Sequence, residues 1–268
     1  MAISWTEETL PKDAAGTATL PVRVYRHADT KRAAPLVFHL HGGAFTGGSV
    51  ASGEQIASLL AEAGAVVISV GYPVNTCECP FPYALQATFH ALNHLHKNRT
   101  NWVAKKSGLY VAGEEAGGNI AAGLALMARD QHEPLLAGQI LLSPMLDPDL
   151  ATKSFRQAQA GAGGCKWADG WNSYLGTVDK ALHPYAAPAN ASRLAGLPPT
   201  LILTCPDDPM RDESLRYADR LRKSGVYVQD QIVTSADHWP EALSQDTTGE
   251  ADWAPLVQRR FTEFFAHS

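Results

Sequence analysis

The chain has 268 residues, of which 45% are hydrophobic and 18% are charged, and its net charge at pH 7 is −5. These values are typical of a globular protein, so one domain spanning residues 1–268 is expected. The negative charge and the lack of a long basic run argue against a nucleic-acid partner. No apolar run approaches the ~20 residues that cross a bilayer, and residues 1–13 lack the basic-then-apolar order of a signal peptide. We therefore expect a cytoplasmic protein without a membrane partner.

Strand-like apolar runs and helix-like spacing alternate along the chain. In chain order we predict strands at 20–26 and 35–40, a helix at 54–62, a strand at 65–70, a helix at 83–96, a strand at 108–112, a helix at 119–130, strands at 139–142 and 200–204, a helix at 211–223, a strand at 226–233 and a helix at 254–266. Strands that are apolar throughout are typical of a sheet covered on both faces. The pattern predicts an α/β fold with a mostly parallel central sheet flanked by helices.

Residues 145–197 break this alternation. They are rich in Trp, Tyr, Gly and Pro and show no strand-like period. A long insertion of this kind is usually a lid or a binding segment, although a packed surface excursion is also possible. We favour a short lid or cap, because the flanking strands should end at the same edge of the sheet as the motif described next.

Residues 111–119 read Val-Ala-Gly-Glu-Glu-Ala-Gly-Gly-Asn and lie between a predicted strand and a predicted helix. This context fits the G-x-S-x-G nucleophile elbow, a sharp strand-to-helix turn that exposes a serine above the sheet of an α/β-hydrolase. Gly113 and Gly117 occupy the glycine positions, and Glu115 stands where the nucleophile should be. A carboxylate therefore replaces the expected hydroxyl.

Other segments carry the same resemblance. They are His41-Gly42-Gly43-Ala44-Phe45, the stretch from Gly71-Tyr72-Pro73 to Pro80-Phe81-Pro82, Leu197-Pro198-Pro199 before Asp208-Pro209-Met210-Arg211-Asp212, and His238-Trp239. In this order, from roughly residue 20 to the end, the chain resembles the hormone-sensitive-lipase-like branch of the α/β-hydrolases. That branch includes bacterial carboxylesterases and plant carboxylesterase-like proteins. The order of nucleophile, acid and histidine is that of the fold.

The resemblance implies roles for particular residues. Asp208 takes the position of the catalytic acid, and His238 takes that of the base, so the chain would have an atypical triad with Glu115 as its third member. The backbone N–H groups that would stabilise a developing oxyanion lie in the turn after strand 35–40 and just after the elbow. The expected oxyanion hole is Gly42, Gly43, Ala44 and Ala116.

Glu115 admits four interpretations. It could be a covalent nucleophile, as the elbow aspartate is in the epoxide hydrolases and haloalkane dehalogenases that the arrangement resembles. It could be a general base, although an ordinary carboxylate is a weak base at neutral pH. It could pair with an imidazolium at His238, which would leave a site that binds without catalysing. A substitution introduced by design is the least favoured, because alanine is the usual choice.

The expected function is a carboxylesterase-type hydrolase of a small ester or related electrophile. The alternatives are a non-catalytic protein that binds a small ligand, and a lyase or dehydratase with Glu115 as its base. No cofactor is expected, and a homodimer is possible by analogy with the family.

Other candidate sites are weaker. Ser143 ends a strand at the correct edge but lacks an elbow. A metal site is disfavoured because its residues match no known spacing; its members would be Asp207, Asp208, Asp212 and His238. The cysteines form no C-x-x-C motif and are read as structural or incidental thiols. They are Cys77, Cys79, Cys165 and Cys205.

Overall fold

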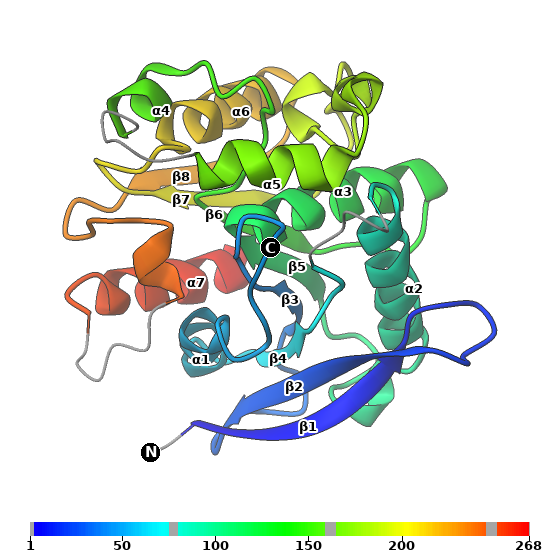
Figure 1. Ribbon diagram of the computed structural model, residues 1–268. Helices are drawn as coiled ribbons and strands as arrows, with labels where there is room; N and C mark the ends of the chain where they lie inside the picture. Colours follow the sequence, from blue (N-terminus) through cyan, green and yellow to red (C-terminus); the bar gives the residue numbers. More distant parts are fainter. Residues whose placement is uncertain (1–2, 75–79, 159–164, 245–250, 268) are drawn as a thin grey trace.

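The computed structural model describes residues 3–74, 80–158, 165–244 and 251–267, and these form one sheet with helices on both faces (Figure 1). The strands are β1 (Ile3–Pro11), β2 (Thr19–His27), β3 (Leu36–Leu40), β4 (Val66–Val70), β5 (Leu109–Glu114), β6 (Gly138–Leu142), β7 (Thr200–Thr204) and β8 (Val228–Ile232). The α-helices are α1 (Glu54–Glu62), α2 (Tyr83–Lys97), α3 (Glu115–Gln131), α4 (Lys153–Ala158), α5 (Lys166–Leu175), α6 (Arg211–Lys223) and α7 (Ala254–His267). Short 3-10 helices are η1 (Arg99–Asn101), η2 (Val178–Leu182), η3 (Pro188–Asn190) and η4 (Glu241–Leu243).

The strand order of the sheet is β1-β2-β4-β3-β5-β6-β7-β8. Neighbouring strands from β4 to β8 in this order pair in parallel. β1 pairs antiparallel with β2, and β2 pairs antiparallel with β4, so these two strands form an antiparallel edge. The prediction of a mostly parallel α/β-hydrolase sheet is therefore confirmed. In a parallel sheet the carboxyl ends of the strands share one edge, which is where binding residues gather. The pairing of Leu40 with Gly113 and of Glu114 with Leu142 places the turns after β3, β5 and β6 side by side.

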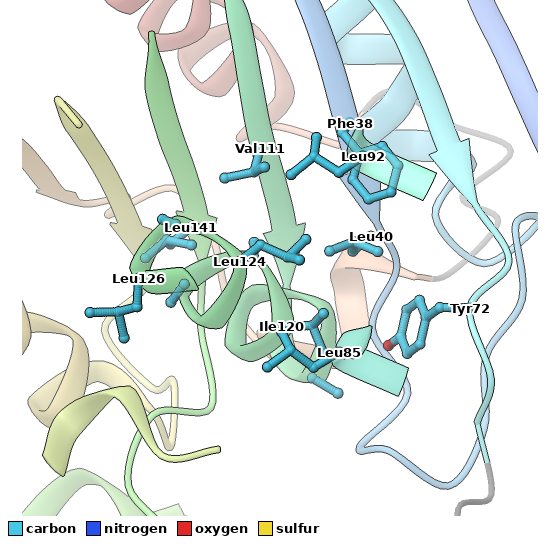
Figure 2. Packing of buried hydrophobic residues seen from close by; sticks show 14 of the residues in the cluster. Phe38, Leu40, Tyr72, Leu85, Leu92, Val111, Ile120, Leu124, Leu126 and Leu141 are labelled. Atoms are coloured by element: carbon cyan, nitrogen blue, oxygen red, sulfur yellow. The ribbon is translucent and has the colours of Figure 1, made fainter. Parts of the chain in front are cut away.

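Strand alternation divides the core into two layers. In β5, Leu109 and Val111 pack on the side of α2 and α3, while Tyr110 and Ala112 pack on the side of α1 and α7. Successive strand residues point to opposite faces, so an apolar run is what a sheet with two covered faces requires. Figure 2 shows residues of the first layer, among them Val111 of β5 and Leu124 of α3.

Helices α1 and α6 and strand β7 have the predicted bounds, but β1, α4 and α5 were not predicted. β1 has only one buried residue, Leu10, because it lies at the edge of the sheet, and its sequence therefore lacks an apolar pattern. The 145–197 insertion contains α4, α5, η2 and η3. Within the described ranges, no helix is both long enough and apolar enough to cross a membrane.

Candidate active site

The elbow forms where β5 ends and α3 begins. Glu115 is the first residue of α3, earlier than the predicted start at 119, and its φ of 52° is in the left-handed region. The turn requires glycine two residues before and two residues after Glu115, because there is no room for a side chain at either position. A Cβ on Gly117 would lie 2.0 Å from the carbonyl oxygen of Leu40, and one on Gly113 would lie 2.4 Å from that of Gly117. Backbone strain of this kind is typical of functional turns.

The turn after β3 faces the elbow side chain. Gly43 has a φ of 124° and Ala44 a φ of 49°, which directs their N–H groups toward α3. Gly43 N donates to Oε2 of Glu115 at 2.6 Å, and Ala44 N donates to the same oxygen at 3.0 Å. The carboxylate of Glu115 thus lies where the oxygen of a reacting carbonyl would lie in an oxyanion hole.

The other two predicted hole residues have different positions. Gly42 N donates to Oε1 of Glu114 at 3.2 Å, so its N–H supports the loop and does not point at Glu115. Ala116 is buried in the first turn of α3, directly after the elbow. The described hydrogen bonds to the Glu115 carboxylate from the loop therefore come from Gly43 and Ala44.

The second oxygen of the carboxylate meets the insertion. Trp167 Nε1, on α5, donates to Oε1 of Glu115 at 2.7 Å. Lys166 Nζ lies 3.8 Å from the same oxygen and 2.8 Å from Oε1 of Glu241 in η4. Sequence reasoning missed Trp167 and Lys166, because nothing in their local spacing distinguishes them from other residues of the insertion.

Helix α5 packs directly on the loop that follows β3. A Cβ on Gly170 would lie only 1.9 Å from the carbonyl oxygen of Ala44. The ring of Phe45 stacks on Tyr174 with 4.1 Å between centroids, and it contacts Trp171 at 5.3 Å. The helix therefore covers the elbow, as a lid over the site would.

Replacing Gly170 with alanine is expected to lower the free energy of unfolding by about 1–3 kcal/mol, because the Ala44 carbonyl is backbone and has little freedom to move. Alanine in a helix would otherwise stabilise it by about 1 kcal/mol over glycine. Gly47→Ala is the matched control. Gly47 lies in the same loop as Ala44, and a Cβ at this position would have no neighbouring atom closer than 3.9 Å. Urea unfolding measures the free energy of unfolding of both variants. A Gly170→Ala protein as stable as wild type would contradict the close packing of α5 on the backbone of Ala44.

A buried polar network lies beneath the loop. His39 Nε2 is 2.8 Å from Oε2 of Glu114, and its Nδ1 is 2.9 Å from Oγ of Ser69. These residues come from the adjacent strands β3, β5 and β4 and are almost fully buried. Because Glu114 also accepts the Gly42 N–H, the network fixes the start of the loop after β3.

His41 supports the loop from its other side. Its ring stacks on Tyr72 with 4.4 Å between centroids, and its Nδ1 lies 2.7 Å from the carbonyl oxygen of Gly42. Burial lowers the pKa of His41, because the imidazolium form would lose its hydration. Nδ1 must then carry the proton that the Gly42 carbonyl accepts, and the ring is a neutral support for the turn.

The predicted acid is buried without the predicted partner. Asp208 accepts hydrogen bonds from the Thr204 hydroxyl and, at 2.8 Å, from Met210 N. Burial raises its pKa to about 7. His238 is 79% exposed and has its Nδ1 3.4 Å from Oδ2 of Asp207, whose carboxylate also accepts the His238 N–H at 3.0 Å.

The structure therefore does not assemble the predicted pair of Asp208 and His238. The physical reason is competition between adjacent carboxylates. Asp207 accepts the backbone N–H of His238, whose φ is 55°, and its carboxylate lies 3.4 Å from the His238 ring, which stays at the surface. Asp208 meanwhile points inward, where Thr204 and Met210 satisfy its oxygens.

The other serine and cysteine candidates that the structure describes are buried or cap a helix. Ser143 is buried. Cys165 caps α5 by accepting the Ala168 N–H at 3.3 Å, and Cys205 is buried. Cys77 and Cys79 lie outside the described residues. Across the described part of the chain, no cluster of His, Cys, Asp and Glu could hold a metal ion.

Comparison with known proteins shows that the chain is similar to esterases in sequence and fold. The family described as alpha/beta hydrolase fold matches residues 37–239. The chain is 34% identical to Carboxylesterase NlhH of Mycobacterium tuberculosis over 221 residues, which cover 80% of this chain and 69% of that protein. It is 33% identical to an arylesterase of Saccharolobus solfataricus over 216 residues, which cover 77% and 68%.

Solved structures agree with these sequences. A thermostable esterase from Pseudomonas putida superposes with a TM-score of 0.87 at 28% identity, covering 99% of this chain and 83% of that one. A bacterial heroin esterase superposes with a TM-score of 0.84 at 29% identity, covering 98% and 83%.

Proposed function

We propose that this chain, which belongs to the α/β-hydrolase family and to its carboxylesterase-type hydrolases, hydrolyses a small ester with Glu115 in place of the nucleophilic serine. The observation that carries the proposal is the position of the Glu115 carboxylate. Its Oε2 accepts both loop N–H groups, from Gly43 and Ala44, and this contact supports a role for the side chain in the reaction.

The described structure is then a resting state, because the carboxylate and a substrate carbonyl compete for the same donors. When the Glu115 side chain turns out of the hole, the carbonyl oxygen of an ester can accept the N–H groups of Gly43 and Ala44. The carboxylate remains within reach of the carbonyl carbon, since the elbow holds its backbone fixed. The donors then stabilise charge that develops only as the carbonyl is attacked.

In this proposal Glu115 is a general base. It takes a proton from water while the water oxygen attacks the carbonyl carbon. The bond from that carbon to the alcohol oxygen then breaks, and Glu115 returns the proton to the leaving alkoxide. The products are an acid and an alcohol, and the carboxylate is regenerated.

Covalent attack by Glu115 is less well supported. It would form a mixed anhydride, which a second activated water must open. His238 would be the residue to activate that water, and its ring lies at the surface against Asp207. Direct activation of a single water by Glu115, which needs no histidine, fits the described arrangement better.

One observation favours a second function, in which the site binds a small ligand without turnover. The hole is filled by a carboxylate that accepts several hydrogen bonds, and Asp208 and His238 lie apart. Such an arrangement is what a family member that has lost hydrolysis would retain.

Hydrolysis of p-nitrophenyl acetate by wild type, Glu115→Gln and Glu115→Ser distinguishes these functions. We expect measurable wild-type activity that falls about 10²-fold or more in the glutamine variant, since a general base contributes about 10²–10⁴-fold. Glu241→Gln is the matched control, because it removes a carboxylate that also contacts Lys166 but lies outside the hole. An inert wild type would contradict hydrolysis, and an active serine variant would then favour the binding function.

A further inference from the structure

The donors around Glu115 address both oxygens of its carboxylate. Oε2 accepts the N–H groups of Gly43 and Ala44, and Oε1 accepts the indole N–H of Trp167 with the Lys166 ammonium 3.8 Å away. The three N–H donors and the nearby Lys166 ammonium, which we together call the carboxylate cradle, come from the loop after β3 and from α5. The Glu115 side chain is only 7% exposed within it.

This arrangement exceeds what an oxyanion hole requires. The carbonyl of an ester presents one strongly accepting oxygen, and Gly43 and Ala44 are sufficient to hold it. Trp167 and Lys166 would then face the weakly accepting alkoxy oxygen. A carboxylate instead presents two equivalent anionic oxygens, and hydrogen bonds to an ionised group are about twice as strong as neutral ones. The donor set therefore fits a free acid better than an ester.

The spacing of the groups in the cradle is fixed, so the cradle fits a ligand of definite size. Gly170 seats α5 against Ala44, and Phe45 stacks on Tyr174, so the distance between the two donor pairs is fixed by packing. Lys166 is held in turn by Glu241 at 2.8 Å and lies over the Trp167 ring at 4.7 Å. A fixed set of donors costs little reorganisation when a ligand binds.

We propose that the carboxylate cradle is a binding site for a small external monocarboxylate, which occupies it whenever the Glu115 carboxylate is absent or turned away. In the native chain Glu115 is a tethered competitor whose effective concentration is on the order of millimolar or higher. On the proposed function, this tethered carboxylate also displaces the acid product after each turnover. The binding site itself does not depend on hydrolysis.

Deletion of the side chain tests the proposal directly. Glu115→Ala removes the Cγ methylene and the carboxyl group, and acetate supplies a methyl and a carboxylate in their place. Glu115→Gly removes one carbon more, which propionate restores. We expect calorimetric titration to show 1:1 binding of acetate to the alanine variant and of propionate to the glycine variant. In each case the affinity should exceed that of wild type at least tenfold.

Second substitutions in the Glu115→Ala chain test the donors. Trp167→Phe keeps an aromatic ring and removes the indole N–H, so it should weaken acetate binding about tenfold or more. Lys166→Met should weaken it less and should reduce its sensitivity to salt, because the lysine side chain is 46% exposed. Acetamide has the shape of acetate without its charge and is the control ligand that should not bind.

Several outcomes would overturn the proposal. One is binding of acetate to Glu115→Gln, whose amide still fills the cradle, as tight as to Glu115→Ala. Another is an unchanged acetate affinity when Trp167→Phe is added to Glu115→Ala. If the alanine variant proves unstable, an acetate-dependent rise in its melting temperature reports the same binding, and the glycine variant with propionate repeats the test. None of these readouts is ester turnover, so failure of hydrolysis and failure of the cradle are separate results.

Discussion

Glu114→Ala is expected to lower the free energy of unfolding by about 3–5 kcal/mol, because it leaves buried donors without an acceptor. The His39 Nε2 and the Gly42 N–H both lose their partner, and neither can reach water. A cavity forms as well. The loss should appear in urea or thermal unfolding as a lower midpoint with an unchanged slope.

Glu114→Gln is the control for this prediction. The amide keeps the volume and one accepting oxygen, so it can still satisfy either His39 or Gly42, and its loss should be clearly smaller than that of alanine. A Glu114→Ala protein within about 1 kcal/mol of wild type would mean that the polar network beneath the loop after β3 is not a main support of the fold.

Asp208→Asn is expected to stabilise the protein above pH 7, by on the order of 2–4 kcal/mol at pH 8. Burial raises the pKa of Asp208 from 3.8 to about 7, so the folded chain holds a proton that the unfolded chain has already released. The contribution of Asp208 to stability is therefore fully present below about pH 4 and is lost as the pH rises to about 7. Asparagine never ionises and escapes this loss.

The difference between the two proteins should thus be near zero at pH 4, grow up to about pH 7 and then stay constant. Asp207→Asn is the matched control, with the opposite sign. Burial raises the pKa of Asp207, but the hydrogen bonds from Cys205 and His238 outweigh it and the net pKa is lowered. Stability in that variant should fall short of wild type above about pH 4. If Asp208→Asn instead had a lower free energy of unfolding than wild type at pH 8, Asp208 would pair with a cationic His238 in solution.

The fold could be predicted from the sequence where strands are buried on both faces. β3, β4 and β7 are apolar or buried throughout, and their positions follow from that pattern alone. β1 is exposed along most of its length, so its pairing with β2 depends on contacts that a local pattern does not contain. Tertiary position, more than propensity, decides such edge strands.

The site could be predicted in part for a similar reason. Parallel strands end at one edge, so residues that follow β3 and β5 must meet, and Gly43 does contact Glu115. The position of Trp167 depends on how α5 packs on the loop, which no sequence spacing encodes. The direction of His238 depends on which of two adjacent carboxylates accepts it, and a sequence motif cannot separate Asp207 from Asp208 on that point.

The Glu115 carboxylate joins residues that are distant along the chain, since Gly43 is 72 positions before it and Trp167 is 52 positions after it. The Gly43 contact spans nearly the same distance along the chain as the pairing of β3 with β5, in which Leu40 pairs with Gly113, whereas the Trp167 contact also requires α5 to pack on the loop after β3. Interactions absent from the folding transition state affect the rate of unfolding and leave the rate of folding nearly unchanged. We therefore expect the contact between Glu115 and Trp167 to affect the rate of unfolding more than the rate of folding.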